Sequence, residues 1–329
     1  EMIDFDVGDL NGDGKNEFVL IDRYRVMIFE NKKGRLKRIS MVKTNKIANH
    51  FLAVDVGDIN GNGRDEIFVT NQQDDKLSSF VLEIKPKQKR LHYTWKDANL
   101  YFRILRPMGK RPILVSQGSG FQNPIEGPIK KVLYKNGKYQ QGPELNTPTV
   151  YGKHFILYGL TQEDLNGNGN PETILLDNNY HLRVYSQKGK LIVKSNDYYG
   201  HDPRMIDVGV EEDVSGAREG DPVRFKGRLE FAKIGNDRFL FLPKNKTVGN
   251  GLLNKLIVVE NSGLAFLKLT GEGFEKAFES SQQKGFMAAS RVVPNSNGKG
   301  ASVYMLRIDH DMISKSISSS FSTYEWPAE

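Results

Sequence analysis

The chain has 329 residues, of which 38% are hydrophobic and 26% are charged, and its formal net charge is +7. This composition is typical of an ordered protein and excludes a disordered one. No apolar run approaches the roughly 18 residues that a membrane-spanning helix needs. The absence of cysteine excludes disulfides, thiol nucleophiles and thiolate metal sites.

The positive charge first raises the question of nucleic-acid binding. The basic residues, however, gather in short pieces at 31–38, 85–90 and 130–138, which we expect to be solvated hairpin turns. We therefore expect no nucleic-acid partner, and at most a weak preference for an anionic envelope surface. The sequence starts inside a motif-like segment without an initiator Met or signal peptide, so we expect it to be the C-terminal part of a longer protein.

The first element is an acidic loop followed by an apolar run, "DLNGDGKNEFVLID", at residues 9–22. Near-copies follow at 58–71 and 164–177, and a degenerate copy, "NSNGKGASV", lies at 295–303. The second copy begins one unit of about fifty residues after the first, and the third begins two such units after the second. Periodicity of this length is typical of solenoids, propellers and repeat arrays.

The rest of each unit predicts β-structure. The runs "EFVLI", "EIFVT" and "ETILL" after the acidic loops are short and almost continuously apolar, as in strands covered on both faces. Alternating runs joined by turns of Lys, Asn or Gly follow at 25–40, 131–142, 182–195 and 265–280, which is a hairpin pattern. An all-β unit of about four strands and fifty residues predicts a β-propeller blade.

The expected blades lie near 1–46, 47–97, 98–148, 149–225, 226–283 and 284–329. Six blades are visible, and the ring holds six or seven, with any further strand upstream of residue 1. Blades three and five lack the acidic loop. Shorter turns at 106–112 and 234–237 join their inner strands. A polar insertion near 198–225 is either a functional loop or a tolerated surface excursion.

The acidic loops have the donors of a calcium site. Side-chain oxygens at positions 1, 3, 5 and 9 of a glycine-kinked turn converge on one point, and the carbonyl of position 7 adds a further ligand. Such a flexible ring of hard oxygens suits Ca²⁺ better than Mg²⁺. The alternative is a hydrogen-bonded Asn/Asp/Gly turn without an ion.

An EF-hand is excluded because its loop needs a bidentate Glu at position 12 and flanking helices. Position 12 here is Leu20, Val69 or Leu175, each in a strand-like run. The pattern D-x-[DN]-x-[DN]-G-x-x-E on an all-β repeat instead resembles the FG-GAP/VCBS family, whose repeats are related to integrin α-subunit propellers.

The resemblance implies three calcium sites, each with four side-chain ligands and one backbone carbonyl. Site one would comprise Asp9, Asn11, Asp13 and Glu17 with the carbonyl of Lys15; site two Asp58, Asn60, Asn62 and Glu66 with that of Arg64; and site three Asp164, Asn166, Asn168 and Glu172 with that of Asn170.

The formal ligand charge falls from −3 at site one to −2 at the others, so we expect site one to bind Ca²⁺ most tightly. In the degenerate copy Lys299 replaces an acidic ligand, and we expect no metal there. The three loops lie in different blades, so we expect structural rather than catalytic ions.

The sequence shows no zinc-protease, P-loop, nucleophile-elbow or dinucleotide motif, and its six histidines are scattered. We expect Trp95 and Trp326 to pack outer strands. The favoured function is a non-catalytic, calcium-stabilised scaffold that binds a protein or glycan in the bacterial envelope or outside the cell, where calcium is abundant. The alternative is a carbohydrate-active enzyme or a lectin on the same fold.

Overall fold

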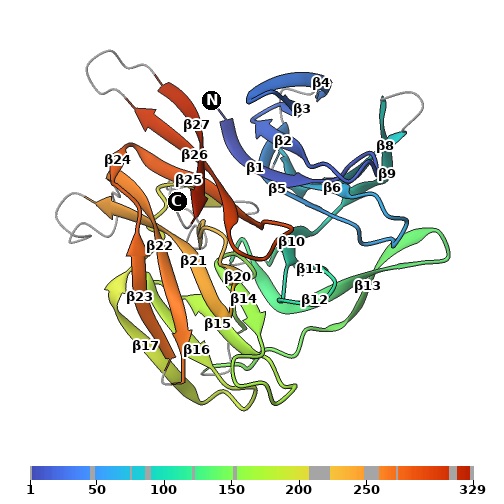
Figure 1. Ribbon diagram of the computed structural model, residues 1–329. Helices are drawn as coiled ribbons and strands as arrows, with labels where there is room; N and C mark the ends of the chain where they lie inside the picture. The colour runs from blue at the N-terminus through green and yellow to red at the C-terminus, as the bar shows by residue number, and fades with distance from the viewer. Residues whose placement is uncertain are drawn as a thin grey trace, which may run out of the picture.

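The computed structural model describes residues 2–44, 49–74, 76–85, 90–120, 123–150, 154–206, 223–247, 259–271, 273–310 and 317–326. Every regular element in these ranges is a β-strand, and the strands form six antiparallel blades in a ring (Figure 1). The protein is therefore an all-β six-bladed propeller, as the repeat predicts. The described part of the chain has no helix long and apolar enough to cross a bilayer.

The first three blades each have four main strands in sequence order. Blade one contains β1 (Met2–Gly8), β2 (Glu17–Asp22), β3 (Arg25–Lys32) and β4 (Arg35–Lys43); blade two contains β5 (Asn49–Gly57), β6 (Glu66–Gln73), β8 (Ser79–Lys85) and β9 (Arg90–Ala98), with short β7 (Lys76–Leu77) on β6; blade three contains β10 (Tyr101–Leu105), β11 (Ile113–Gly118), β12 (Glu126–Lys135) and β13 (Lys138–Glu144).

Two further blades repeat this order, and the sixth has three strands among the described residues. Blade four contains β14 (Leu160–Glu163), β15 (Glu172–Leu176), β16 (His181–Tyr185) and β17 (Leu191–Tyr198); blade five contains β20 (Glu230–Ile234), β21 (Asp237–Thr247), β22 (Val259–Thr270) and β23 (Gly273–Glu279), with β24 (Gln283–Lys284) on β22; blade six contains β25 (Phe286–Pro294), β26 (Ala301–His310) and β27 (Ile317–Trp326).

Local sequence explains these elements. The strands that follow the acidic loops, β2 and β15, are buried along their whole length, and β6 is buried except at its last two residues. They are covered on both faces, which accounts for their continuous apolar runs. The hairpin turn at Asn136–Gly137 has positive φ at both residues, the geometry that Asn-Gly favours. The basic pieces at 31–38 and 130–138 span such hairpins, as expected, whereas 86–89 lie outside the described residues.

The hydrophobic core is divided between the blades. Six clusters of buried side chains occur among the described residues. Five of them join one blade to the next around the ring, and the sixth spans blades two, three and four. The cluster between blades six and one includes Phe5, Phe18 and Leu306, and the red sheet accordingly lies beside the blue one in Figure 1. Trp95 and Trp326 pack against two of these clusters, which confirms their predicted role.

The described part of the 198–225 insertion is packed against the ring, while 207–222 lie outside the described residues. A two-stranded ribbon, β18 (Met205–Ile206) with β19 (Val223–Arg224), brings Ile206 and Phe225 into the cluster with Tyr101 and Tyr158. Arg204 donates hydrogen bonds of 2.7 Å to the carbonyls of Ile3 and Ala288, near the starts of β1 and β25. This segment therefore covers the propeller face on which the inner strands begin.

Candidate functional site: the acidic loops and the propeller axis

The three acidic loops lie on the opposite face, where the inner strands end. Each connects the innermost strand of its blade to the second strand: β1 to β2, β5 to β6, and β14 to β15. Glycines at positions 4 and 6 of every loop have positive φ, which allows the tight turn. The strand-flanked loops agree with the exclusion of an EF-hand.

Loop one is organised around the Asp9 carboxylate. Its Oδ1 accepts hydrogen bonds from the amides of Gly12 (2.7 Å) and Asp13 (3.1 Å), and its Oδ2 accepts one from Gly14 (2.8 Å). Glu17 closes the base, where Oε2 accepts from the Leu10 amide and Oε1 from the Asn11 side chain. The loop thus holds its predicted side-chain ligands on one turn.

The surroundings of Glu17 disfavour the ionised form of its carboxylate. Burial raises its pKa to about 7, and the nearby charges of Asp13 and Asp9 add to this rise. Burial likewise raises the pKa of Glu66, in loop two, to about 7. A bound cation would favour the ionised form of both groups.

Loops two and three repeat this scaffold. Asp58 accepts from the amides of Gly61, Asn62 and Gly63, and Asp164 accepts from those of Asn168 and Gly169. In loop three the Asn166 side chain again donates to Glu172, at 2.8 Å. In the degenerate loop, the Lys299 amide donates to Asn297, and Asn295 and Gly300 close a turn.

Within the described residues, no three acidic or histidine side chains converge closely enough to hold a metal ion. The Asp13 carboxylate, for example, accepts a hydrogen bond from the Lys15 amide at 2.9 Å. The donors nevertheless fit a hard divalent cation in kind, because every predicted ligand is an oxygen. One oxygen of Glu66, Oε1, is also buried without a hydrogen bond of good geometry, although the Tyr139 hydroxyl is near enough to lower the pKa of Glu66.

Loops and turns are linked to neighbouring blades. The Asp65 amide of loop two donates to the Asp9 carbonyl at 2.9 Å, and its carboxylate accepts from the Asp9 amide at 2.8 Å. In blade five, Arg238 donates to the carbonyls of Asp164 and Leu165 in loop three. Loops one and three are therefore hydrogen-bonded to the adjacent blade.

Sequence reasoning missed Glu83, which lies on β8 directly beside loop two. Its Oε1 accepts from the side-chain amides of Asn62 (2.6 Å) and Asn60 (3.2 Å). The contact depends on the register between β6 and β8, which pairs Ile67 with Leu82, and no local sequence pattern gives that register.

A second feature that the sequence did not reveal is a buried charge network on the propeller axis. It combines four acids with four arginines: Asp4, Asp6, Asp55 and Glu230 with Arg103, Arg106, Arg228 and Arg291. Burial raises the pKa of Asp6, but the guanidiniums of Arg106 and Arg291 outweigh it and hold that pKa far below its ordinary value. Each axial acid therefore has an arginine partner.

A groove of about 580 Å³ lies between blades four and five, next to loop three. Polar groups from Asn166, Glu172 and Asn236 line it together with the apolar Ile192 and Leu269. This size is in the range of ligand-binding pockets.

Family comparison bears on the loops just described. Residues 9–69, which contain loops one and two, match the model of the FG-GAP-like repeat. The chain carries an FG-GAP-like repeat. The β-propeller fold and the FG-GAP-like repeat together support a scaffold or binding role for this chain.

No curated protein matches the chain. Solved structures similar in fold include BBS1N in complex with ARL6DN, at 10% identity and a TM-score of 0.42, over 92% of this chain and 76% of that one. A protein from Lactobacillus plantarum is also 10% identical with a TM-score of 0.42, over 98% of this chain and 84% of that one.

Proposed function

We propose that this chain is a calcium-stabilised, non-catalytic propeller scaffold that binds a protein or glycan partner outside the cytoplasm. The observation that carries the proposal is the pairing of the axial acids. A glycosidase or lyase acting across the channel would need a carboxylate free to exchange protons with substrate. Asp4, Asp6, Asp55 and Glu230 are instead buried and bound by arginines.

The calcium part of the proposal rests on the donor set of the three loops. Asp9, Asp58 and Asp164 would each anchor one ion, together with the side chains at positions 3, 5 and 9 and the carbonyls of Lys15, Arg64 and Asn170. A bound ion would neutralise the carboxylates and hold the loop against the next blade. Loops with two or three carboxylates need the calcium levels found outside the cytoplasm, which supports the proposed location.

The groove between blades four and five is the proposed place for the partner. Its amide and carboxylate groups can hydrogen-bond to a sugar or to a peptide backbone, and its apolar wall can bury a small hydrophobic surface. Ile192 on that wall is 53% exposed, so it is available for contact.

The test combines a glycan array and a co-purification screen with a polysaccharide-turnover assay. We expect a bound partner, no turnover, and at least a tenfold loss of affinity in Ile192→Ser, about 1.4 kcal/mol. Met205→Ser is the matched control, because Met205 is 51% exposed but lies on the opposite face. Turnover that is abolished by changing one or two carboxylates outside the acidic loops would establish the enzyme alternative and reject the scaffold.

A further inference from the structure

Strand direction places the outer turns of the blades on the same side of the ring as the acidic loops. In blade one β1 ends at this side, β2 runs away from it and β3 returns, so the turn between β3 and β4 also lies there. The same antiparallel order is repeated in blades two to five. Outer turns that are far apart in the sequence therefore meet at the rim of one face.

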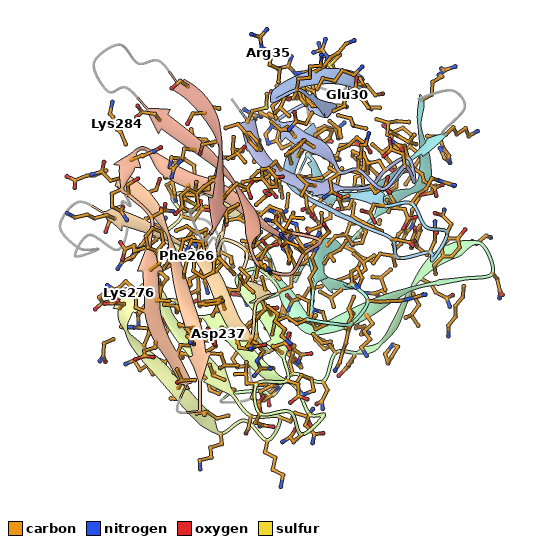
Figure 2. All side chains as sticks on the ribbon, viewed as in Figure 1. Glu30, Arg35, Asp237, Phe266, Lys276 and Lys284 are labelled. Carbon is orange, nitrogen blue, oxygen red and sulfur yellow. The ribbon has the colours of Figure 1, made fainter. Side chains whose placement is uncertain are left out.

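The outer turn of blade one is strongly basic. Residues 31–38 are all exposed, and they contain five cations and no acid. Within the described part of the chain only one of these cations, Lys32, forms an ion pair, with Glu30 at 3.0 Å. Arg35 extends from the margin of the molecule (Figure 2). The positive charge of this turn thus faces solvent with little compensation.

The outer turns of the next three blades repeat this feature. Each has two exposed cations, no acid and no ion pair among the described residues: Lys85 and Arg90 in blade two, Lys135 and Lys138 in blade three, and Lys188 and Lys190 in blade four. In blade five, by contrast, Lys268 before the outer turn is paired with Asp237 at 2.9 Å. We term the outer turns of blades one to four, at 31–38, 85–90, 135–138 and 188–190, the basic arc.

The basic arc follows the rim of the face. The outer strand of blade two, β9, lies against β4 of blade one and β13 of blade three, so these three turns are neighbours. At the other end, Lys190 is followed closely by Ile192 and Val193, which line the groove between blades four and five. A linear chain of negative charges can therefore meet one blade after another and end in that groove.

Two exposed tyrosines lie close to the basic turns. Tyr93 on β9 is 41% exposed, and Tyr134 on β12 is 38% exposed. The Nζ atom of Lys96 lies 4.6 Å from the centroid of the Tyr93 ring, and the Tyr134 and Tyr139 ring centroids are 4.9 Å apart. Rings held in this way can pack against the apolar face of a sugar while their hydroxyls stay in water.

The tips of the turns do not suit a lipid bilayer. They are formed by Lys33–Gly34, Asn136–Gly137 and Gly189, all with positive φ. None of these residues has an apolar side chain that could enter the hydrocarbon, which membrane-surface binding needs in addition to positive charge.

We propose that the basic arc binds a linear acidic polysaccharide, with carboxylate or sulfate groups, whose chain follows the rim from blade one to the groove between blades four and five. This inference rests on the proposed binding function and names the chemical class of the partner. The proposed location outside the cytoplasm favours a polysaccharide over a nucleic acid. Because single exposed ion pairs contribute little, binding depends on many of them together and weakens as salt screens them.

Titration of the full chain with labelled chondroitin sulfate, at low and high salt, tests the proposal, and uncharged dextran is the control ligand. We expect chondroitin sulfate to bind, with an affinity that falls as salt rises, and dextran not to bind. Lys135→Gln/Lys138→Gln should bind about fivefold more weakly at low salt. Lys76→Gln/Lys246→Gln is the matched control, because it removes the same charge from exposed positions near the opposite face and should bind as wild type.

The outcomes separate this inference from the proposed function. Equal affinities of the two double variants, or a wild-type chain that binds no chondroitin sulfate, would overturn the inference and leave the scaffold proposal intact. Tighter binding of single-stranded DNA or of phosphatidylglycerol vesicles at the same salt would also overturn it. Cleavage of chondroitin sulfate by the wild-type chain would instead reject the non-catalytic scaffold itself.

Discussion

Asp6 shows how much of this fold depends on single buried charges. Its carboxylate accepts from Arg106 (2.5 Å) and Arg291 (2.8 Å), and it also accepts from the Val56 amide at 2.8 Å. These partners come from blades three, six and two, so one side chain of blade one touches half of the ring. Charges of this kind are costly to bury alone and stabilise the fold only while they are paired.

Replacing Asp6 with Asn should remove the carboxylate partner of the buried Arg106 and leave the buried Arg291 with Glu230 alone. We expect Asp6→Asn to reduce the free energy of unfolding by about 3–5 kcal/mol, measured by urea denaturation. Asp237→Asn is the control, because Asp237 forms an exposed pair with Lys268 and should cost under about 1 kcal/mol. Similar losses in the two variants would show that the axial network does not stabilise the ring.

Lys226 should make the stability of the folded protein depend on pH. Burial lowers its pKa to about 8, and its ammonium donates to the Leu176 carbonyl and the Asn178 side chain. In the unfolded chain the pKa is about 10.4. Between these values the unfolded state binds more protons, so stability contributed by this group rises as pH increases from 8 toward 10.

We expect wild type to gain stability relative to Lys226→Met between pH 8 and 9.5. The difference in unfolding free energy between the two proteins, measured by denaturant titration at each pH, isolates this residue. A difference in unfolding free energy that stays constant between pH 8 and 9.5 would contradict the lowered pKa of the buried Lys226.

At the scale of elements, the acidic loops and the strands after them were predictable from sequence, because their signals are local. Asp9, Gly12, Gly14 and Glu17 lie within nine residues of one another, and the following strand is continuously apolar. The contact of Glu83 with Asn62 was not predicted, since it depends on the register between β6 and β8. The calcium ligands themselves stay a prediction of the loop pattern.

Asp9→Ala and Asn295→Ala compare a predicted calcium loop with the degenerate copy. Asp9 accepts three loop amides, so its loss should cost about 1–3 kcal/mol without any ion. We expect a further loss when calcium is present, and no calcium-dependent loss in Asn295→Ala. Denaturation of both variants with calcium and with chelator measures the difference, and an Asp9→Ala cost that ignores calcium would contradict ion binding at loop one.

At the scale of the molecule, the repeat period predicted the propeller, but not what fills its axis. Asp6 and Arg291 are separated by 285 residues, and no local pattern marks them as partners. The same holds for the insertion, where Arg204 reaches carbonyls of blades one and six. Long-range pairs of this kind form when the ring closes. The repeat pattern of one sequence predicts the number of blades but not which residues meet at the axis.

We propose that calcium ions bound in three loops hold neighbouring blades together. The most direct measurement is thermal unfolding of the full chain, first shown by elemental analysis to be loaded with calcium, with and without excess chelator. We expect chelator to lower the melting temperature and restored calcium to raise it again. An unchanged melting temperature after verified removal of the metal would contradict it.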